Sequence, residues 1–89
     1  MLNRATAQEL HDTAKIAGVM VIWIVSSADP EHPGKVTARP HTADAHGEVL
    51  LVGVLVADTP AQLRAMKPVG LTVRPRDPFH MPEILETWD

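Results

Sequence analysis

The chain has no cysteine among its 89 residues. Disulfide bonds, thiolate metal sites and a cysteine nucleophile are therefore excluded. The absence fits a reducing compartment, and we predict a cytoplasmic location. Aromatic side chains are scarce as well, at 3% of the sequence, and comprise Trp23, Phe79 and Trp88. Because 45% of the residues are hydrophobic, we expect a folded chain with a mainly aliphatic core.

The sequence also lacks a long apolar segment and an excess of basic residues. No run approaches the roughly 18 apolar residues of a membrane span, so we predict no contact with a membrane. Residues 16–25 resemble the core of a signal peptide, but Glu9 and Asp12 lie just before it, and cleavage would remove a predicted strand. The formal charge of −3 weighs against nucleic acid as a partner.

The longest run of small and apolar residues covers 49–57, from Val49 to Ala57. We interpret it as one buried strand that leads into a short helix. Pro60 suits the first helical position, and Thr59 before it is a typical N-cap. Gln62 is placed to bond back to the Thr59 amide in a capping box. Pro68 disfavours helix at the preceding residue, so we expect the helix to end by residue 67.

The remaining elements are predicted from hydrophobic alternation and from proline and glycine. Together they indicate an α+β fold, with an antiparallel or mixed sheet of four to five strands, one short crossing helix and a possible N-terminal helix. Glu83–Asp89 is compatible with a helix or a strand, and we prefer the strand. The expected strands are 20–25, 35–39, 49–57, 71–74 and 83–89. Pro40 ends the second of them or keeps it near an edge of the sheet. We expect a loop at 26–34 that turns at Pro33-Gly34 and a polar turn at 41–47.

Residues 1–19 differ from the rest of the chain. Thr6 and Glu9 have the spacing of a capping box, and a weak helical stripe ends near Gly18, a plausible C-cap. The stripe consists of Ala7, Leu10, Ala14 and Ala17. Met20 directly precedes the first strand and could serve as an alternative start. We therefore predict an extension over 1–19, either helical or disordered, that the fold does not require, and a single α+β domain over 20–89.

Several short pieces of the sequence together suggest a family. They are Ile22-Trp23-Ile24-Val25, His32-Pro33-Gly34-Lys35, Ala57-Asp58-Thr59, Leu63-Arg64 and Glu86-Thr87-Trp88. In their order, over residues 20–89, they resemble a family of small uncharacterised bacterial proteins, mainly from alphaproteobacteria. The family's members look as though they begin near Met20, so residues 1–19 depart from it. The resemblance implies a fold and no catalytic activity.

Two clusters contain residue types that carry out chemistry. His41, Asp44 and His46, with Glu48 nearby, could bind a divalent metal ion, although turns also favour such residues for backbone reasons. The loop at 26–34 contains the residue types of a hydrolytic triad without its sequence signature. These are Ser26, Ser27, Asp29 and His32. We assign no catalytic residue and no cofactor.

Three arginines are candidates for binding an anionic ligand. Arg74 and Arg76 flank Pro75 and could hold a phosphate or carboxylate through bidentate hydrogen bonds. Arg39 projects from the polar face of a predicted strand. The alternative is a solvated rim of basic side chains, which the acidic total charge favours.

For function we carry two hypotheses. The first is a non-enzymatic interaction module that self-associates as a homodimer, because the runs 20–25 and 49–57 are apolar on both faces, whereas a strand with one solvated face alternates. The second is a small-ligand or metal-dependent enzyme that uses the turn at 41–48. The sequence alone does not decide whether the protein is an enzyme, and we favour the first hypothesis.

Overall fold

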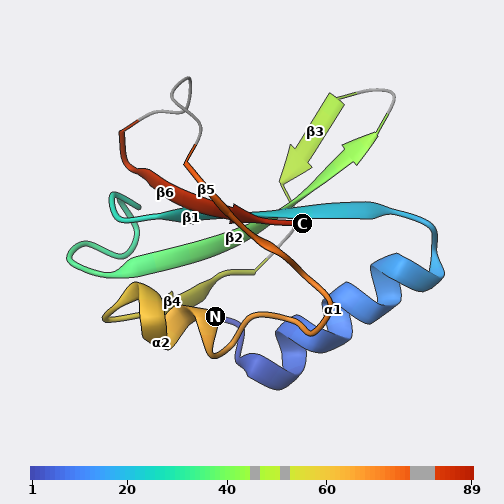
Figure 1. Ribbon diagram of the computed structural model, residues 1–89, viewed down its shortest axis with the longest axis horizontal. Coiled ribbons are helices and arrows are strands. Elements are labelled where there is room, and N and C mark those ends of the chain that lie inside the picture. Colours follow the sequence, from blue (N-terminus) through green and yellow to red (C-terminus); the bar gives the residue numbers. More distant parts are fainter. Residues whose placement is uncertain (45–46, 51–52, 77–81) are drawn as a thin grey trace.

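The computed structural model of the protein describes residues 1–44, 47–50, 53–76 and 82–89, and for residues 43, 44 and 47–50 it describes the backbone only. Within these residues the chain forms two helices, α1 (Arg4–Ile16) and α2 (Pro60–Arg64), and six strands (Figure 1). The strands are β1 (Met20–Ser26), β2 (Val36–Asp44), β3 (Gly47–Leu50), β4 (Leu55–Ala57), β5 (Val73–Pro75) and β6 (Ile84–Trp88).

All strand pairs of the single sheet are antiparallel. The order across the sheet is β3-β2-β1-β6-β5, and β4 pairs with residues 36–38 of β2 while β3 pairs with residues 41–44. Five strand positions therefore lie side by side, with β3 and β4 sharing one of them. The predicted α+β class and the antiparallel sheet are confirmed.

Both helices pack on the same face of the sheet (Figure 1). Ala7 of α1 and Leu63 of α2 are completely buried there, together with Trp23 of β1 and Trp88 of β6. The two indole rings are tilted, with centroids 6.3 Å apart, within the range in which aromatic pairs attract. We call this covered side the inner face.

The prediction of one buried strand over 49–57 is wrong. The run is divided between β3 and β4, which pair with different halves of β2. Gly53 has a φ of +122°, and a Cβ atom there would lie 2.9 Å from Leu2, whose amide donates to the Val54 carbonyl. Only glycine adopts this backbone conformation readily, and Leu2 packs against it, so the strand does not continue through residue 53.

The predicted end of the second strand is wrong as well. β2 continues through Pro40 to Asp44, so the polar turn expected at 41–47 is largely strand. Pro40 is buried and pairs with Trp23. On the other edge of β2, residues 39 and 40 lie between the segments paired with β4 and β3. The N–H that Pro40 lacks would therefore have had no partner strand on that edge, and no hydrogen bond of the sheet is lost there. The strand predicted at 71–74 is found slightly later, as β5.

The short helix α2 begins as predicted, and its C-terminal limit also holds. Thr59 is the N-cap, and its hydroxyl accepts from the Gln62 amide at 3.2 Å. The reciprocal bond differs from the predicted capping box, because the Gln62 side chain accepts from the Asp58 amide at 3.1 Å. Leu63 supplies the buried contact, and Met66 packs beside it.

Helix α1 begins earlier than its sequence pattern indicates. Asn3, not Thr6, is the N-cap, and the two side chains each accept from the other's amide at 2.8 Å. Ala7, Leu10 and Ala14 face the core as predicted, whereas Ala17 is exposed. The Gln8 side chain accepts from the Val69 amide at 2.7 Å. That residues 1–19 are dispensable stays a prediction, and these contacts argue against it.

The C-terminal segment forms the preferred strand, β6, and it contains a buried charge. Glu86 is 3% exposed on the inner face. Its carboxylate accepts from Arg64 Nε at 3.0 Å and from Trp88 Nε1 at 2.7 Å. A β-bulge lies in β6 opposite Val25 and Ser26. It reverses which side chains point inward in the residues before Glu86. Leu85 packs against the core and Ile84 pairs with Ser26, so Glu86 and Trp88 share the inner face whereas Ile84 does not.

The break at Gly53 gives a first testable prediction. Gly53→Ala should lower the free energy of unfolding by about 1–3 kcal/mol, because alanine is strained in this backbone conformation and its methyl group would meet Leu2. Gly18→Ala is a matched control, since Gly18 has a φ of +73° and open space around its Cα, and it should cost about 1 kcal/mol. Equal urea midpoints for Gly53→Ala and the parent protein would contradict this account of the break.

The buried carboxylate gives a second prediction. Arg64 holds the pKa of Glu86 below its ordinary value of 4.5, and burial opposes this only in part. A carboxyl group with a lowered folded pKa stabilises the protein above its unfolded pKa, and this contribution is lost as pH falls through the folded pKa. Glu86→Gln should therefore cost about 1–3 kcal/mol near neutral pH, and the difference should shrink below pH 4.5. Parallel curves of stability against pH for both proteins would refute this role.

Candidate functional site

Neither of the two described helices covers the opposite face of the sheet, which we call the outer face (Figure 1). Strand alternation assigns its residues. In β1, Val21, Trp23 and Val25 are buried inward, and the residues between them point outward. The register places these outward residues beside partners in β2 and β6. The outer face comprises Met20, Ile22, Ile24 and Ser26 of β1, Thr37, Arg39 and His41 of β2, and Thr87 of β6.

The β1–β2 loop folds over one end of the outer face. The predicted turn at Pro33-Gly34 is present, since Gly34 has a φ of +76° and the Lys35 amide donates to the His32 carbonyl at 3.2 Å. Asp29, on this loop, is only 8% exposed. Its carboxylate accepts from Arg39 Nε at 2.6 Å and from the Glu31 amide at 3.0 Å.

Arg39 is held by two carboxylates of this loop. Besides the bond to Asp29, its Nη2 donates to the exposed Glu31 at 3.1 Å. The hydrogen bond from Arg39 holds the pKa of Asp29 below its ordinary value, although burial of the carboxylate opposes this shift. Both carboxylates in turn raise the pKa of Arg39. The charges of this cluster are therefore satisfied within the chain.

A cavity of about 420 Å³ lies beside this cluster on the outer face. Ile24 and Ile84 form part of its wall, and the bulge in β6 is what turns Ile84 toward it. The ionisable groups that line it are Asp29, Glu31, Arg39, His41 and Glu83. The outer face thus combines an aliphatic stripe along β1 with a cluster of both charge signs.

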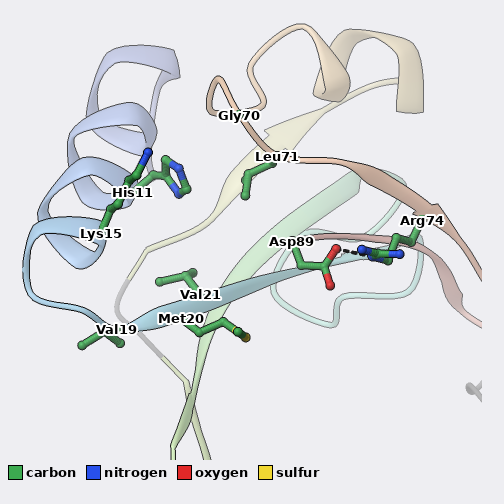
Figure 2. A pocket seen from close by; sticks show the side chains of 9 residues that line it. All are labelled: His11, Lys15, Val19, Met20, Val21, Gly70, Leu71, Arg74 and Asp89. Carbon is green, nitrogen blue, oxygen red and sulfur yellow. Dashed lines mark hydrogen bonds and ion pairs between the residues drawn. The ribbon is translucent and has the colours of Figure 1, made fainter.

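A second cavity, also about 420 Å³, lies between the C-terminal half of α1, the start of β1 and the segment that leads into β5 (Figure 2). We call it the α1–β5 pocket. His11 and Lys15 lie on the helix face turned toward Leu71, and Val21 lies deeper in the pocket. On the far side, Arg74 forms an ion pair with Asp89.

The three arginines predicted to bind ligand do not converge. Arg39 lies on the outer face, Arg74 lines the α1–β5 pocket, and Arg76 is an exposed residue after β5. Arg39 and Arg74 each pair with carboxylates of the same chain. Their role in ligand binding stays a prediction.

The predicted metal site falls mostly outside the described side chains. His46 is not among the described residues, and of Asp44 and Glu48 only the backbone is described. His41 is on the outer face, and it takes part in an interaction of its own. In the part of the chain that the structure describes, no three His, Asp or Glu residues are grouped closely enough to hold a metal ion. The metal-dependent enzyme hypothesis therefore stays a prediction.

Of the basic residues of the α1–β5 pocket, the sequence pointed to Arg74 but not to His11 or Lys15. His11 and Lys15 are four positions apart, a spacing that places two side chains on one helix face. This spacing can be seen in the sequence, but it identifies a binding site only when the segment that faces the helix is known. Residues 70–74, nearly sixty positions later in the chain, could not be placed there from local patterns.

Comparison of the chain with protein-family models, with curated proteins and with solved structures finds no match. No helix among the described residues is long and apolar enough to cross a membrane. The pieces that carry the family resemblance meet one another in the structure. Lys35 pairs with Asp58, Arg64 pairs with Glu86, and the two tryptophan rings are neighbours.

The Arg39 cluster allows a matched comparison of two carboxylates. Asp29→Asn should destabilise the protein by about 1–3 kcal/mol, since it weakens a charge-assisted bond to a buried acceptor. Glu31→Gln removes a partner of the same arginine whose side chain is 75% exposed, and it should cost less than about 1 kcal/mol. Denaturant unfolding at neutral pH measures both, and a larger cost for Glu31→Gln would reverse our assignment of the structural partner.

Proposed function

We propose that this protein is a non-enzymatic interaction module that self-associates as a homodimer through its outer face. One observation carries the proposal: both helices cover the inner face, while an aliphatic stripe runs along β1 on the other side. Met20 at the end of that stripe is 65% exposed, and Ile22 and Ile24 are half-buried. Continuous aliphatic surface on a small protein commonly marks an interface.

The composition of the outer face suits pairing with a second copy of itself. In a two-fold interface each patch meets its own equivalent, so the patch must complement itself. Here the aliphatic stripe can meet the same stripe, and the Arg39 cluster offers charges of both signs. A patch with one sign of charge would repel its copy, whereas this one does not.

The edges of the sheet are less suited to association. The edge strands β3, β4 and β5 have four, three and three residues, and β5 ends at Pro75, which has no N–H to donate. Short strands and proline at an edge disfavour the addition of another strand. The face of the sheet is therefore the better candidate than its edges.

The apolar run 49–57 supports self-association less than β1 does. Leu55 of the run 49–57 is completely buried inside the subunit, and Val54 is nearly so, while residues 51 and 52 lie outside the described part. The evidence for self-association from strands that are apolar on both faces therefore comes from β1. A cytoplasmic location and the absence of a nucleic acid partner remain parts of the proposal, supported by the lack of cysteine and by the acidic total charge.

A charge placed in the stripe tests the proposal. We expect size-exclusion chromatography with light scattering to give the mass of a dimer at tens of micromolar protein. Ile22→Lys should give a monomer, because two-fold symmetry would bring the two new ammonium groups close together, while the lysine stem keeps much of the aliphatic contact within the subunit.

Val69→Lys is the matched control. Val69 is 74% exposed, but its backbone contacts α1 on the helix side, so this variant should stay dimeric. Thermal unfolding monitored by circular dichroism verifies that both variants are folded. A monomeric parent protein, or dissociation by Val69→Lys to the same extent, would contradict the proposal.

A further inference from the structure

We propose that the α1–β5 pocket binds a small organic monoanion, namely a carboxylate on a short aliphatic body. The inference does not rest on self-association, and the two surfaces share one residue, Met20, which ends the β1 stripe and also lines the pocket. Its basis is a concave site that joins two basic side chains, unpaired within the described residues, to an apolar wall. Its volume of about 420 Å³ lies in the usual range of small-molecule sites, roughly 300–1,000 Å³.

The charges of the pocket favour an anion. His11 and Lys15 reach the same cavity from successive turns of α1 (Figure 2). Within the described residues, neither side chain has a hydrogen bond or an ion pair. Such an arrangement stands out in a chain whose formal charge is −3, where carboxylates outnumber the basic partners available to them. Lys15 also suits the last turn of a helix, where cations are favourable, but that effect does not account for His11 one turn earlier.

The opposite side of the pocket limits the charge of the ligand. Arg74 lies there, but its guanidinium is already paired with Asp89. The carboxylate of Asp89 would repel a dianion such as a phosphate monoester more strongly than a monoanion. One negative group, placed against Lys15 and His11, fits this distribution best.

The walls of the pocket call for an apolar body next to that charge. Val21 is buried at its base, and Leu71 packs against the core. Val19 and Met20 at the rim are 40% and 65% exposed, and a bound aliphatic chain would cover them. A few polar groups beside apolar walls are typical of sites that recognise small amphiphilic ligands.

Titration with hexanoate, followed by amide NMR shifts of the full chain, tests the inference. We expect saturable shifts centred on Lys15, Val21 and Leu71. Hexylamine, with the same apolar body and the opposite charge, should not bind, and acetate, with the charge alone, should bind much more weakly. No saturable shift with hexanoate, or equal binding of hexylamine, would overturn the proposal.

Lys15→Gln and Arg4→Gln form the matched pair of variants. Both remove one positive charge from an exposed position of α1, but only Lys15 lines the pocket. Lys15→Gln should weaken hexanoate binding about tenfold, the factor expected for the loss of one charge-assisted hydrogen bond. Arg4→Gln should leave the affinity within about twofold, since an exposed charge outside the pocket is screened by salt. Equal weakening by both variants would show unspecific attraction to the helix and refute the site.

Discussion

One buried carboxylate, that of Glu86, connects distant parts of the fold. A chain of this size buries only about 60% of its unfolded surface, so few contacts connect its distant parts. Glu86 accepts from Arg64 of α2 and from the indole of Trp88, whose ring lies beside that of Trp23 in the adjacent strand β1. One side chain therefore joins a five-residue helix, the last strand and the centre of the sheet. Without its cation the carboxylate would be buried unpaired, which is among the costliest states for a side chain.

This arrangement explains why the two faces of the sheet differ. Glu86 and Leu63 hold α2 on the inner face, and Leu2 and Ala7 hold α1 beside it, so nothing in the described chain is left to act as a second helical layer. Among the described residues, the outer face receives the β1–β2 loop, which Arg39 and Asp29 anchor over one end. The stripe along β1 and the α1–β5 pocket are open in the part of the chain that the structure describes. They differ in chemistry, since the first is aliphatic and the second contains the basic side chains of His11 and Lys15.

Much of the fold could be predicted from the sequence, because many of its signals are local. Thr59 and Pro60 define the start of α2, and Gly34 defines the turn before β2. The failures share a cause. Gly53 breaks an apolar run because Leu2 packs against it. Pro40 can lie within β2 because neither β3 nor β4 pairs with that position. Both facts depend on residues far away in the chain. The candidate sites show the same limit, because single residues such as Arg39 and Arg74 could be named but not the carboxylates that occupy them.

The central claim is that the outer face meets a second copy of the protein. Intermolecular NOEs in an equimolar mixture of labelled and unlabelled chains test it most directly, because they identify the side chains that touch across an interface. The account predicts NOEs between subunits from the methyl groups of Ile22, Ile24 and Met20. Intermolecular NOEs confined to Ile16 and Val69, or none under conditions where the mass is that of a dimer, would contradict it.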